Sequence, residues 1–505
     1  MLWALLRMWA LLTALGLLAL AALYVAHRVA NPPSAHERRP PFNACRVLTV
    51  LAAGLERAGL LAQDAEADVE QLLDAATAKA RARVGTRGLS ILGGAASEGD
   101  GGGAADWLSM RRNLGVVLSH MLRAQGGSGA GAQGGVSALW AKSNARMTVG
   151  SYIGKRLRVA AALAARPHVR ALPLRRPVVV LVGTWRTGST LLHNLLAAHP
   201  LGRPVRRWEM LAPTDTPAEF GGAAPDRVKV DTLAIKLSAP DLDRIHTYAL
   251  GQADECHTMW HSGMMMELVC HLPGMGGALT HYLDGLDARA QYAEQRLALQ
   301  LLCAPPDEAA CAAACAPGAP PAPGYLVLKD PLHSYHLEAL AAELPHARFV
   351  WLHRDPVMAL ASACSLTACL REAACPAFAN VDLHDVGRRN LRLVSEVFER
   401  GLAQRARLEA AGAASFVDVH YKDLVADTFG TLKRLYAELG IGFGAEAEAA
   451  VRAFHAEQAA LRKKGKRRQG YALAEFGLDE AEVRRRFRPY CERFGVAQEQ
   501  QRVTG

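Results

Sequence analysis

Closely paired cysteines are missing from this sequence. Its 505 residues contain ten cysteines, and no two of them have the Cys-x-x-Cys spacing that structural zinc sites use. We therefore expect no metal site. Cys303, Cys311 and Cys315 stand in or beside an Ala/Pro-rich stretch at residues 304–324, which we interpret as a surface insertion, and there they form either a local disulfide or free thiols.

The sequence also lacks the features of a nucleic-acid-binding protein. Its net charge of +10, from 58 Lys and Arg against 48 Asp and Glu, favours anionic ligands or surfaces. However, the most basic run, residues 462–468, has no aromatic or groove-reading element beside it, so we expect no nucleic acid as a partner. Charged residues make up 21% of the chain and hydrophobic residues 50%, which excludes wholesale disorder and provides for a large core.

The central motif of the chain is a glycine loop between a strand and a helix. Residues 178–182 are a β-branched and aliphatic run that predicts a buried strand, and residues 189–196 have helical spacing. Such a loop directs backbone N–H groups and the positive end of the helix dipole at one small volume, which predicts a site for a phosphate-like anion. The loop and its flanks consist of Gly183, Thr184, Trp185, Arg186, Thr187, Gly188, Ser189 and Thr190.

This loop lacks the lysine of the ATPase and kinase loops that it resembles in spacing. Ser189 stands in the lysine position, so Arg186 becomes the cation for a transferred group. A sulfuryl group carries less charge than a phosphoryl group, and a guanidinium, hydroxyls and backbone amides can stabilise its transfer without Mg²⁺. Ser189 and the lack of a convincing Walker aspartate disfavour a P-loop kinase or NTPase. An ordinary glycine turn is the structural alternative.

A second motif follows another predicted strand, at residues 349–352. Arg354 lies just after this strand, and a predicted helix begins at about residue 357, with Ser362 about two turns into it. A guanidinium beside a hydroxyl suits a terminal phosphate. Taken alone the motif is weak, because an Arg354–Asp355 surface pair at a helix start explains it equally well.

The two motifs together resemble a known family. In order along the chain stand RRWEML, ADECH, LVLKDPLHSYHL, FVWLHRDP and AEFGLDE, within residues 175–496. This set resembles sulfotransferases that use 3'-phosphoadenosine 5'-phosphosulfate, and it is closest to the broad bacterial and algal-type family with an arginine in the first loop. The resemblance implies a three-layer, P-loop-like α/β fold with a central parallel sheet. It also implies that the glycine loop holds the 5'-phosphosulfate of this co-substrate, and that Arg354 and Ser362 hold its 3'-phosphate.

The resemblance further implies transfer of a sulfuryl group to a hydroxyl or amine on a carbohydrate, a lipid or a small metabolite. The candidate catalytic residues are Arg186, Lys329, Glu209, His257 and His333, and Glu255 is a less favoured base. Glu209 lies 23 residues beyond Arg186, and similar carbohydrate sulfotransferases place a glutamate base at such a spacing. The alternative for Glu209 is an ion pair with Arg206 or Arg207. Two positions depart from the family, since Asp330 replaces a common serine and Ser189 a common threonine. A nucleotide-binding scaffold without activity is the remaining alternative.

The N-terminal part predicts a membrane anchor. Residues 8–26 are nineteen uncharged positions rich in Leu and Ala, long enough to cross a bilayer as a helix. We favour an uncleaved signal anchor over a cleavable signal peptide because the run is longer than the usual apolar core of such a peptide. The expected organisation is an anchor at residues 1–28, a stalk and helical stem at 29–166 and a catalytic domain at 167–500. It predicts a single-pass membrane protein of the Golgi with a lumenal catalytic domain.

Overall fold

The computed structural model describes most of the chain beyond residue 137. The described ranges are 138–174, 177–214, 250–260, 276–305, 307–316, 323–374, 381–464 and 472–499, with residues 229, 318 and 319 and a few positions between 73 and 120. The expected membrane anchor and stalk lie outside these residues. Within the described ranges, no helix is both long enough and apolar enough to span a membrane.

A five-stranded sheet forms the centre of the molecule, with the strand order β2-β3-β1-β4-β5 and parallel pairing throughout. The expected parallel sheet is thus confirmed, and four of its strands lie where the apolar runs at residues 178–182, 325–329, 349–352 and 416–420 predict them. The three-residue strand β2 was not predicted. The strands are β1 (Val178–Gly183), β2 (Gly202–Pro204), β3 (Tyr325–Lys329), β4 (Ala347–His353) and β5 (Ser415–His420).

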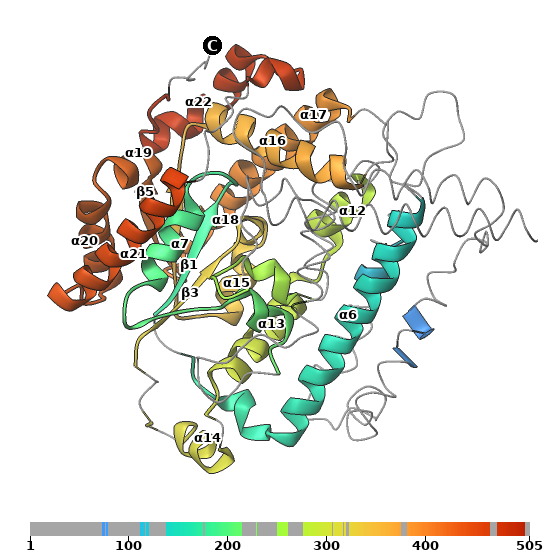
Figure 1. Ribbon diagram of the computed structural model, residues 1–505, viewed down its shortest axis with the longest axis vertical. Coiled ribbons are helices and arrows are strands. Elements are labelled where there is room, and N and C mark those ends of the chain that lie inside the picture. The colour runs from blue at the N-terminus through green and yellow to red at the C-terminus, as the bar shows by residue number, and fades with distance from the viewer. Residues whose placement is uncertain are drawn as a thin grey trace, which may run out of the picture.

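Helices cover both faces of the sheet, which is why β1 is apolar at every position. Alternate side chains of β1 enter two separate cores, Val178, Val180 and Val182 on one face and Val179 and Leu181 on the other. The first face is covered by α6 (Ala138–Ala165), α13 (Ala288–Cys303) and α15 (Leu337–Glu343), and the second by α7 (Ser189–Ala197), α20 (Thr428–Leu439) and α21 (Ala445–Lys464) (Figure 1).

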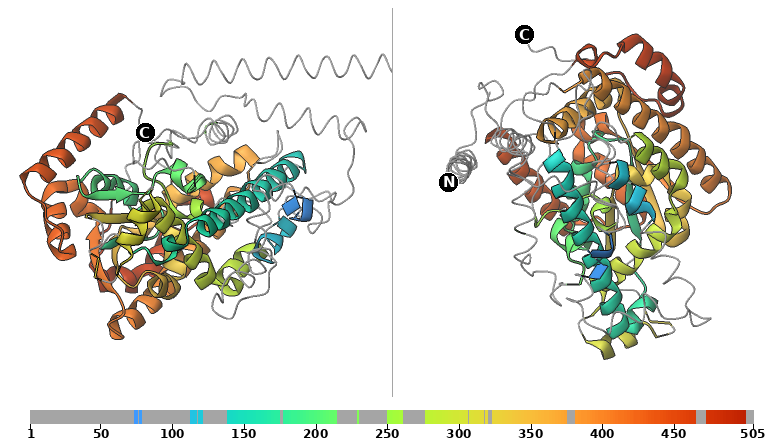
Figure 2. Two further views of the ribbon diagram at one scale, coloured as in Figure 1. Left: turned by 90° about the horizontal axis from the view of Figure 1, so that it is seen from below. Right: turned by 90° about the vertical axis from the view of Figure 1, so that its right-hand side faces the viewer.

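The long helix α6 belongs to this core, although the sequence assigned residues 29–166 to a stalk and stem. Its residues Tyr152, Ile153 and Leu157 are buried in the same cluster as strand β1. Figure 2 shows α6 on the side of the sheet opposite to α20 and α21. The compact unit therefore begins before residue 167.

A third cluster brings distant parts of the chain to the carboxyl ends of the strands. It joins α16 (Pro356–Ala374) and α17 (Leu383–Glu396) to α22 (Glu480–Phe494) near the C-terminus (Figure 1). Val357 and Leu360 of α16 pack in this cluster with Val483 and Phe487 of α22. The end of the described chain is thereby held close to the turn that follows β4.

One sequence expectation for local structure needs correction. The sequence predicts one helix over residues 331–344, but this helix is divided, because Pro331–Tyr335 is a short 3₁₀ turn and α15 begins only at Leu337. Asp330 accepts the backbone N–H of Leu332 at 2.9 Å, which caps this tighter turn. The expected surface insertion contains a short helix, α14 (Glu308–Ala314), whose Cys311 is buried in a small apolar cluster. Cys311 and Cys315 carry free thiols.

Candidate functional site

The glycine loop follows β1 and precedes α7, as the sequence predicts. Its backbone is left-handed at two positions, with φ of 65° at Arg186 and 88° at Gly188. Gly183 also has a positive φ of 120°, and a Cβ added there would lie 2.9 Å from the backbone oxygen of Leu352 in β4. The tight turn thus requires glycine at the end of the strand.

A serine that the sequence analysis missed holds the base of this loop. The N–H of Gly183 donates to Ser334 Oγ at 2.9 Å, and this hydroxyl donates back to the Gly183 carbonyl at 3.1 Å. Ser334 is fully buried in the 3₁₀ turn after β3. The only signal in the sequence is its place five residues after Lys329, in the segment LVLKDPLHSYHL.

The structure brings together three of the residues predicted to bind the anionic groups of a nucleotide. Arg186 Nε donates to Ser362 Oγ at 3.0 Å, and Arg354 donates to the backbone oxygen of Arg186 at 2.8 Å. The sequence expected Ser362 to accompany Arg354, whereas here it contacts the loop arginine. Two guanidinium groups and a hydroxyl therefore meet at the carboxyl ends of β1 and β4.

Arg354 also holds a carboxylate from the end of the described chain. Its Nε and one terminal nitrogen donate to the two oxygens of Glu499 at 2.9 and 3.0 Å, while its guanidinium lies 4.2 Å from the ring centre of Tyr421. This paired geometry is the one in which arginine binds carboxylates and phosphates. Glu499 thus takes up the face of Arg354 that a terminal phosphate would use.

Lys329 lies on the other side of the loop, at the end of β3. Its ammonium donates to Glu255 Oε1 at 2.7 Å and lies 3.4 Å from Thr190 Oγ1 in the first turn of α7. The lysine side chain is 2% exposed. A third cation, besides the two arginines, therefore adjoins the predicted anion site.

The two strands that flank β1 end in the same way, with a cation, an aspartate and a proline. After β3, Asp330 accepts the N–H groups of Leu332 (2.9 Å) and His257 (2.5 Å), and it lies 3.1 Å from His257 Nδ1. Asp330, which replaces a serine common in the family, thus accepts hydrogen bonds from two backbone N–H groups.

The turn after β4 repeats the arrangement. Asp355 accepts the N–H groups of Val357 (3.0 Å) and Glu499 (2.7 Å). Each aspartate therefore ties down the segment that supplies a glutamate to the cation before it, namely Glu255 to Lys329 and Glu499 to Arg354.

Glu209 is part of a buried ion pair. Its two oxygens accept from Arg203 at 2.8 and 3.0 Å, and one of them also accepts the N–H of Arg206 at 2.8 Å. The side chain is 1% exposed. The sequence analysis gave an ion pair with Arg206 or Arg207 as the alternative to a catalytic role. The observed partner is instead Arg203 of β2, and Arg207 pairs with Asp254. The role of Glu209 as a base stays a prediction.

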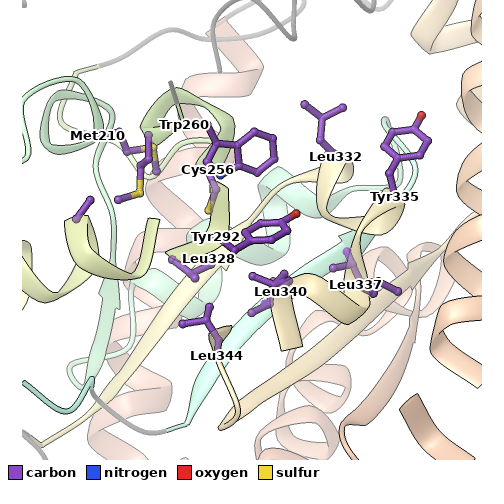
Figure 3. Close-up of a cluster of buried hydrophobic side chains, with 14 of the residues drawn as sticks. Met210, Cys256, Trp260, Tyr292, Leu328, Leu332, Tyr335, Leu337, Leu340 and Leu344 are labelled. Atoms are coloured by element: carbon purple, nitrogen blue, oxygen red, sulfur yellow. The ribbon is translucent and has the colours of Figure 1, made fainter. Parts of the chain in front are cut away.

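His333 lies in the hydrophobic core rather than at the loop. Its ring packs 5.4 Å from that of Trp260 and 5.5 Å from that of Tyr292, whose hydroxyl is 3.1 Å from His333 Nδ1. Figure 3 shows Trp260 and Tyr292 among the apolar side chains of this cluster. Burial lowers the pKa of His333 to about 4, so the imidazole is neutral at pH 7.

Three side chains of metal-ligand type also converge here. Ligand atoms of Glu255, His257 and Asp330 lie within 4.8 Å of one another. The Lys329 ammonium already lies against the Glu255 carboxylate, and Asp330 accepts backbone N–H groups. These contacts compete with a divalent cation, so the donor set fits a metal poorly.

Comparison with known proteins supports the resemblance found in the sequence. The profile of the sulfotransferase family matches residues 177–444. Two mycobacterial proteins, both named omega-hydroxy-beta-dihydromenaquinone-9 sulfotransferase Stf3, from Mycobacterium bovis and Mycobacterium tuberculosis, are 28% identical over 120 residues. That match spans 23% of this chain and only 29% of those relatives.

Two solved structures share the fold. The sulfotransferase STF9 from Mycobacterium avium superimposes with a TM-score of 0.62 at 24% identity, over 84% of this chain and 97% of the other. STF1 from Mycobacterium tuberculosis gives a TM-score of 0.60 at 24% identity, over 84% and 98%.

Proposed function

The chain belongs to the sulfotransferase family, and from that premise we propose that it transfers a sulfuryl group from 3'-phosphoadenosine 5'-phosphosulfate to a hydroxyl or amine. The observation that supports this donor is the convergence of Arg186, Lys329 and Arg354 on one loop at the carboxyl ends of three neighbouring strands. A nucleotide with charged groups at both its 5' and 3' positions matches cations on both sides of the loop.

In this proposal each group has a separate task. The backbone N–H groups of the loop, with the hydroxyls of Thr187, Ser189 and Thr190, hold the 5'-phosphosulfate. Arg186 and Lys329 stabilise the negative charge that develops as the bond between sulfur and the bridging oxygen breaks. Arg354 and Ser362 bind the 3'-phosphate.

We propose a lipid alcohol as the first acceptor to test. The name of the two curated relatives states a hydroxylated menaquinone as their substrate. The apolar residues 8–26 would place the catalytic domain beside such a substrate if they anchor it in a membrane, and we propose this anchor with the domain in the Golgi lumen. Release of the full-length protein by alkaline carbonate, which strips peripheral proteins, would contradict the anchor.

Binding and turnover separate this function from its rivals. Calorimetric titration with 3'-phosphoadenosine 5'-phosphate, against ATP with Mg²⁺, distinguishes a sulfotransferase from a kinase-like protein. Turnover of a ³⁵S-labelled donor with a panel of lipid, carbohydrate and amine acceptors then distinguishes an enzyme from an inactive scaffold. Tight binding of ATP with Mg²⁺, without binding of 3'-phosphoadenosine 5'-phosphate, would overturn the proposal.

Arg354→Ala is expected to weaken binding of 3'-phosphoadenosine 5'-phosphate by about 2 to 4 kcal/mol, because a desolvated phosphate loses its guanidinium partner. Affinity for adenosine 5'-phosphate, which has no 3'-phosphate, should barely change. Glu499→Gln is the matched variant and should tighten binding of the bisphosphate, because it removes the carboxylate that competes with the phosphate for Arg354. Calorimetry measures all three effects, and equal losses for both nucleotides in Arg354→Ala would contradict the assignment.

Chelation is expected to leave the activity unchanged. The proposed reaction uses Arg186, Lys329 and backbone donors. Lys329 also forms an ion pair with Glu255, the carboxylate at which a metal would bind. We would compare initial rates of sulfuryl transfer with and without excess EDTA. Activity that is abolished by EDTA and restored by Mg²⁺ would favour the kinase-like alternative.

A further inference from the structure

We propose that Glu255 is the base that accepts the acceptor's proton, and that Asp330 positions it. The proposal rests on the proposed sulfuryl transfer, which requires that a hydroxyl or amine lose a proton as it attacks sulfur. Of the other candidates, Glu209 is engaged by Arg203, and His333 is enclosed by aromatic side chains. His257 is buried, and its Nδ1 lies 3.1 Å from Asp330.

The location of Glu255 places its carboxylate close to the anion loop. Its carboxylate lies 2.7 Å from Lys329 Nζ, which in turn lies 3.4 Å from Thr190 at the start of the loop helix. The side chain of Glu255 is 15% exposed, against 1% for Glu209. Glu255 thus combines proximity to the anion loop with access from solvent, which an acceptor needs.

The segment that carries Glu255 is fixed on both sides. Before it, Asp254 accepts the N–H of Glu255 at 2.8 Å and forms an ion pair with Arg207. After it, Asp330 accepts the N–H of His257 at 2.5 Å. Lys155 of α6 then donates to the carbonyl oxygen of Thr258 at 2.8 Å. A base held in this way is preorganised, which is a requirement for efficient proton transfer.

The pair with Lys329 also couples proton transfer to departure of the leaving group. In the reaction a bond forms between the acceptor oxygen and sulfur, and the bond between sulfur and the 5'-phosphate oxygen breaks with its electron pair remaining on that oxygen. The acceptor's proton moves to Glu255. Because Glu255 loses its charge at the same time as the phosphate gains one, Lys329 can shift its electrostatic interaction from the carboxylate to the departing phosphate. This interaction is stronger in the transition state than in the ground state, as catalysis requires.

The simpler alternative is that Glu255 only neutralises the charge of Lys329. The two roles predict opposite results for Glu255→Gln. A counter-ion that competes with the donor would, when removed, tighten donor binding and leave kcat near the wild-type value. A base would, when removed, lower kcat with little change in nucleotide affinity.

Two phenols that differ in acidity provide the test. At pH 8, p-nitrophenol is largely ionised and needs no base, whereas phenol keeps its proton. With the ³⁵S-labelled donor, Glu255→Gln is expected to lower kcat for phenol by about a hundredfold and kcat for p-nitrophenol much less. Calorimetry with 3'-phosphoadenosine 5'-phosphate, which should bind within about threefold of wild type, confirms that the variant is folded.

Asp330→Asn tests the positioning role, with Asp355→Asn as its matched control. An asparagine that keeps the Leu332 N–H bond turns its own NH₂ group toward the N–H of His257, so the segment carrying Glu255 loses its anchor. The ratio of the phenol and p-nitrophenol rates should therefore fall in Asp330→Asn. This ratio should stay at the wild-type value in Asp355→Asn, because Asp355 anchors Glu499 and not Glu255.

The outcomes separate this inference from the proposed function. Equal losses on both phenols in Glu255→Gln, or an unchanged kcat, would overturn the role of Glu255. A phenol-selective loss in Glu209→Gln instead would identify Glu209 as the base. If the wild-type protein binds the bisphosphate but transfers the label to no acceptor, the proposed enzymatic function itself fails.

Discussion

Glu209→Gln is expected to lower the free energy of unfolding by about 3 to 5 kcal/mol, because it leaves the charge of Arg203 buried without its carboxylate. The pair has two charge-assisted hydrogen bonds, and its side chains are only 7% and 1% exposed. Glutamine also cannot accept from both guanidinium nitrogens in the same geometry. Chemical denaturation of the purified protein, monitored by tryptophan fluorescence, measures the loss.

Glu338→Gln provides the matched control for this prediction. Glu338 also binds an arginine through two nitrogens of Arg407, but its side chain is 44% exposed and that of Arg407 is 60% exposed. Solvent screens such a pair, so we expect a much smaller loss of stability than in Glu209→Gln. A double variant in which Arg203 and Glu209 are both replaced by methionine should recover much of the stability, since neither buried charge then remains.

The same variant also tests the catalytic role predicted for Glu209 from the sequence. That role requires a loss of about a hundredfold in kcat with nearly unchanged affinity for 3'-phosphoadenosine 5'-phosphate. A stable Glu209→Gln protein with this kinetic defect would support the base and contradict the structural role. A variant that is less stable, but has the wild-type kcat at temperatures where it is folded, would support the structural role and contradict the base.

The difference between these two roles illustrates what the sequence could and could not predict. The strand β1, the glycine loop and helix α7 form from consecutive residues, so the apolar run, the glycine and the helical spacing were enough to locate them. The position of Arg354 at the end of β4 followed from the same local pattern. These predictions depend on short-range geometry that one stretch of chain determines.

Two of the missed partners are distant in the sequence. Glu499 lies 145 residues from Arg354, and Ser334 lies 151 residues from Gly183. Nothing near either residue in the sequence signals such a pairing, since strand order decides which chain segments meet at the sheet edge. Arg203 was missed for a different reason, because β2 has only three residues and no detectable alternation.

Arg186→Ala is expected to lower kcat by about a thousandfold, the loss typical of removing a donor that stabilises charge in the transition state. The effect should be confined to catalysis, because the contact of Arg354 with this position uses the backbone oxygen, which alanine keeps. Binding of 3'-phosphoadenosine 5'-phosphate, which has no sulfuryl group, should therefore weaken far less than kcat falls. Initial rates with the labelled donor and calorimetry with the product nucleotide measure the two quantities.

Arg186→Gly separates the side chain of this arginine from its backbone. Arg186 has a φ of 65°, a left-handed conformation that costs a residue with a Cβ atom about 1 kcal/mol relative to glycine. We therefore expect Arg186→Gly to lose as much activity as Arg186→Ala. It should, however, unfold at a higher denaturant concentration than Arg186→Ala. The native arginine then keeps a strained loop conformation for the sake of catalysis, as functional sites often do. If either variant keeps its kcat while Lys329→Ala abolishes it, Lys329 is the cation that stabilises the transferred group and the assignment of Arg186 is wrong.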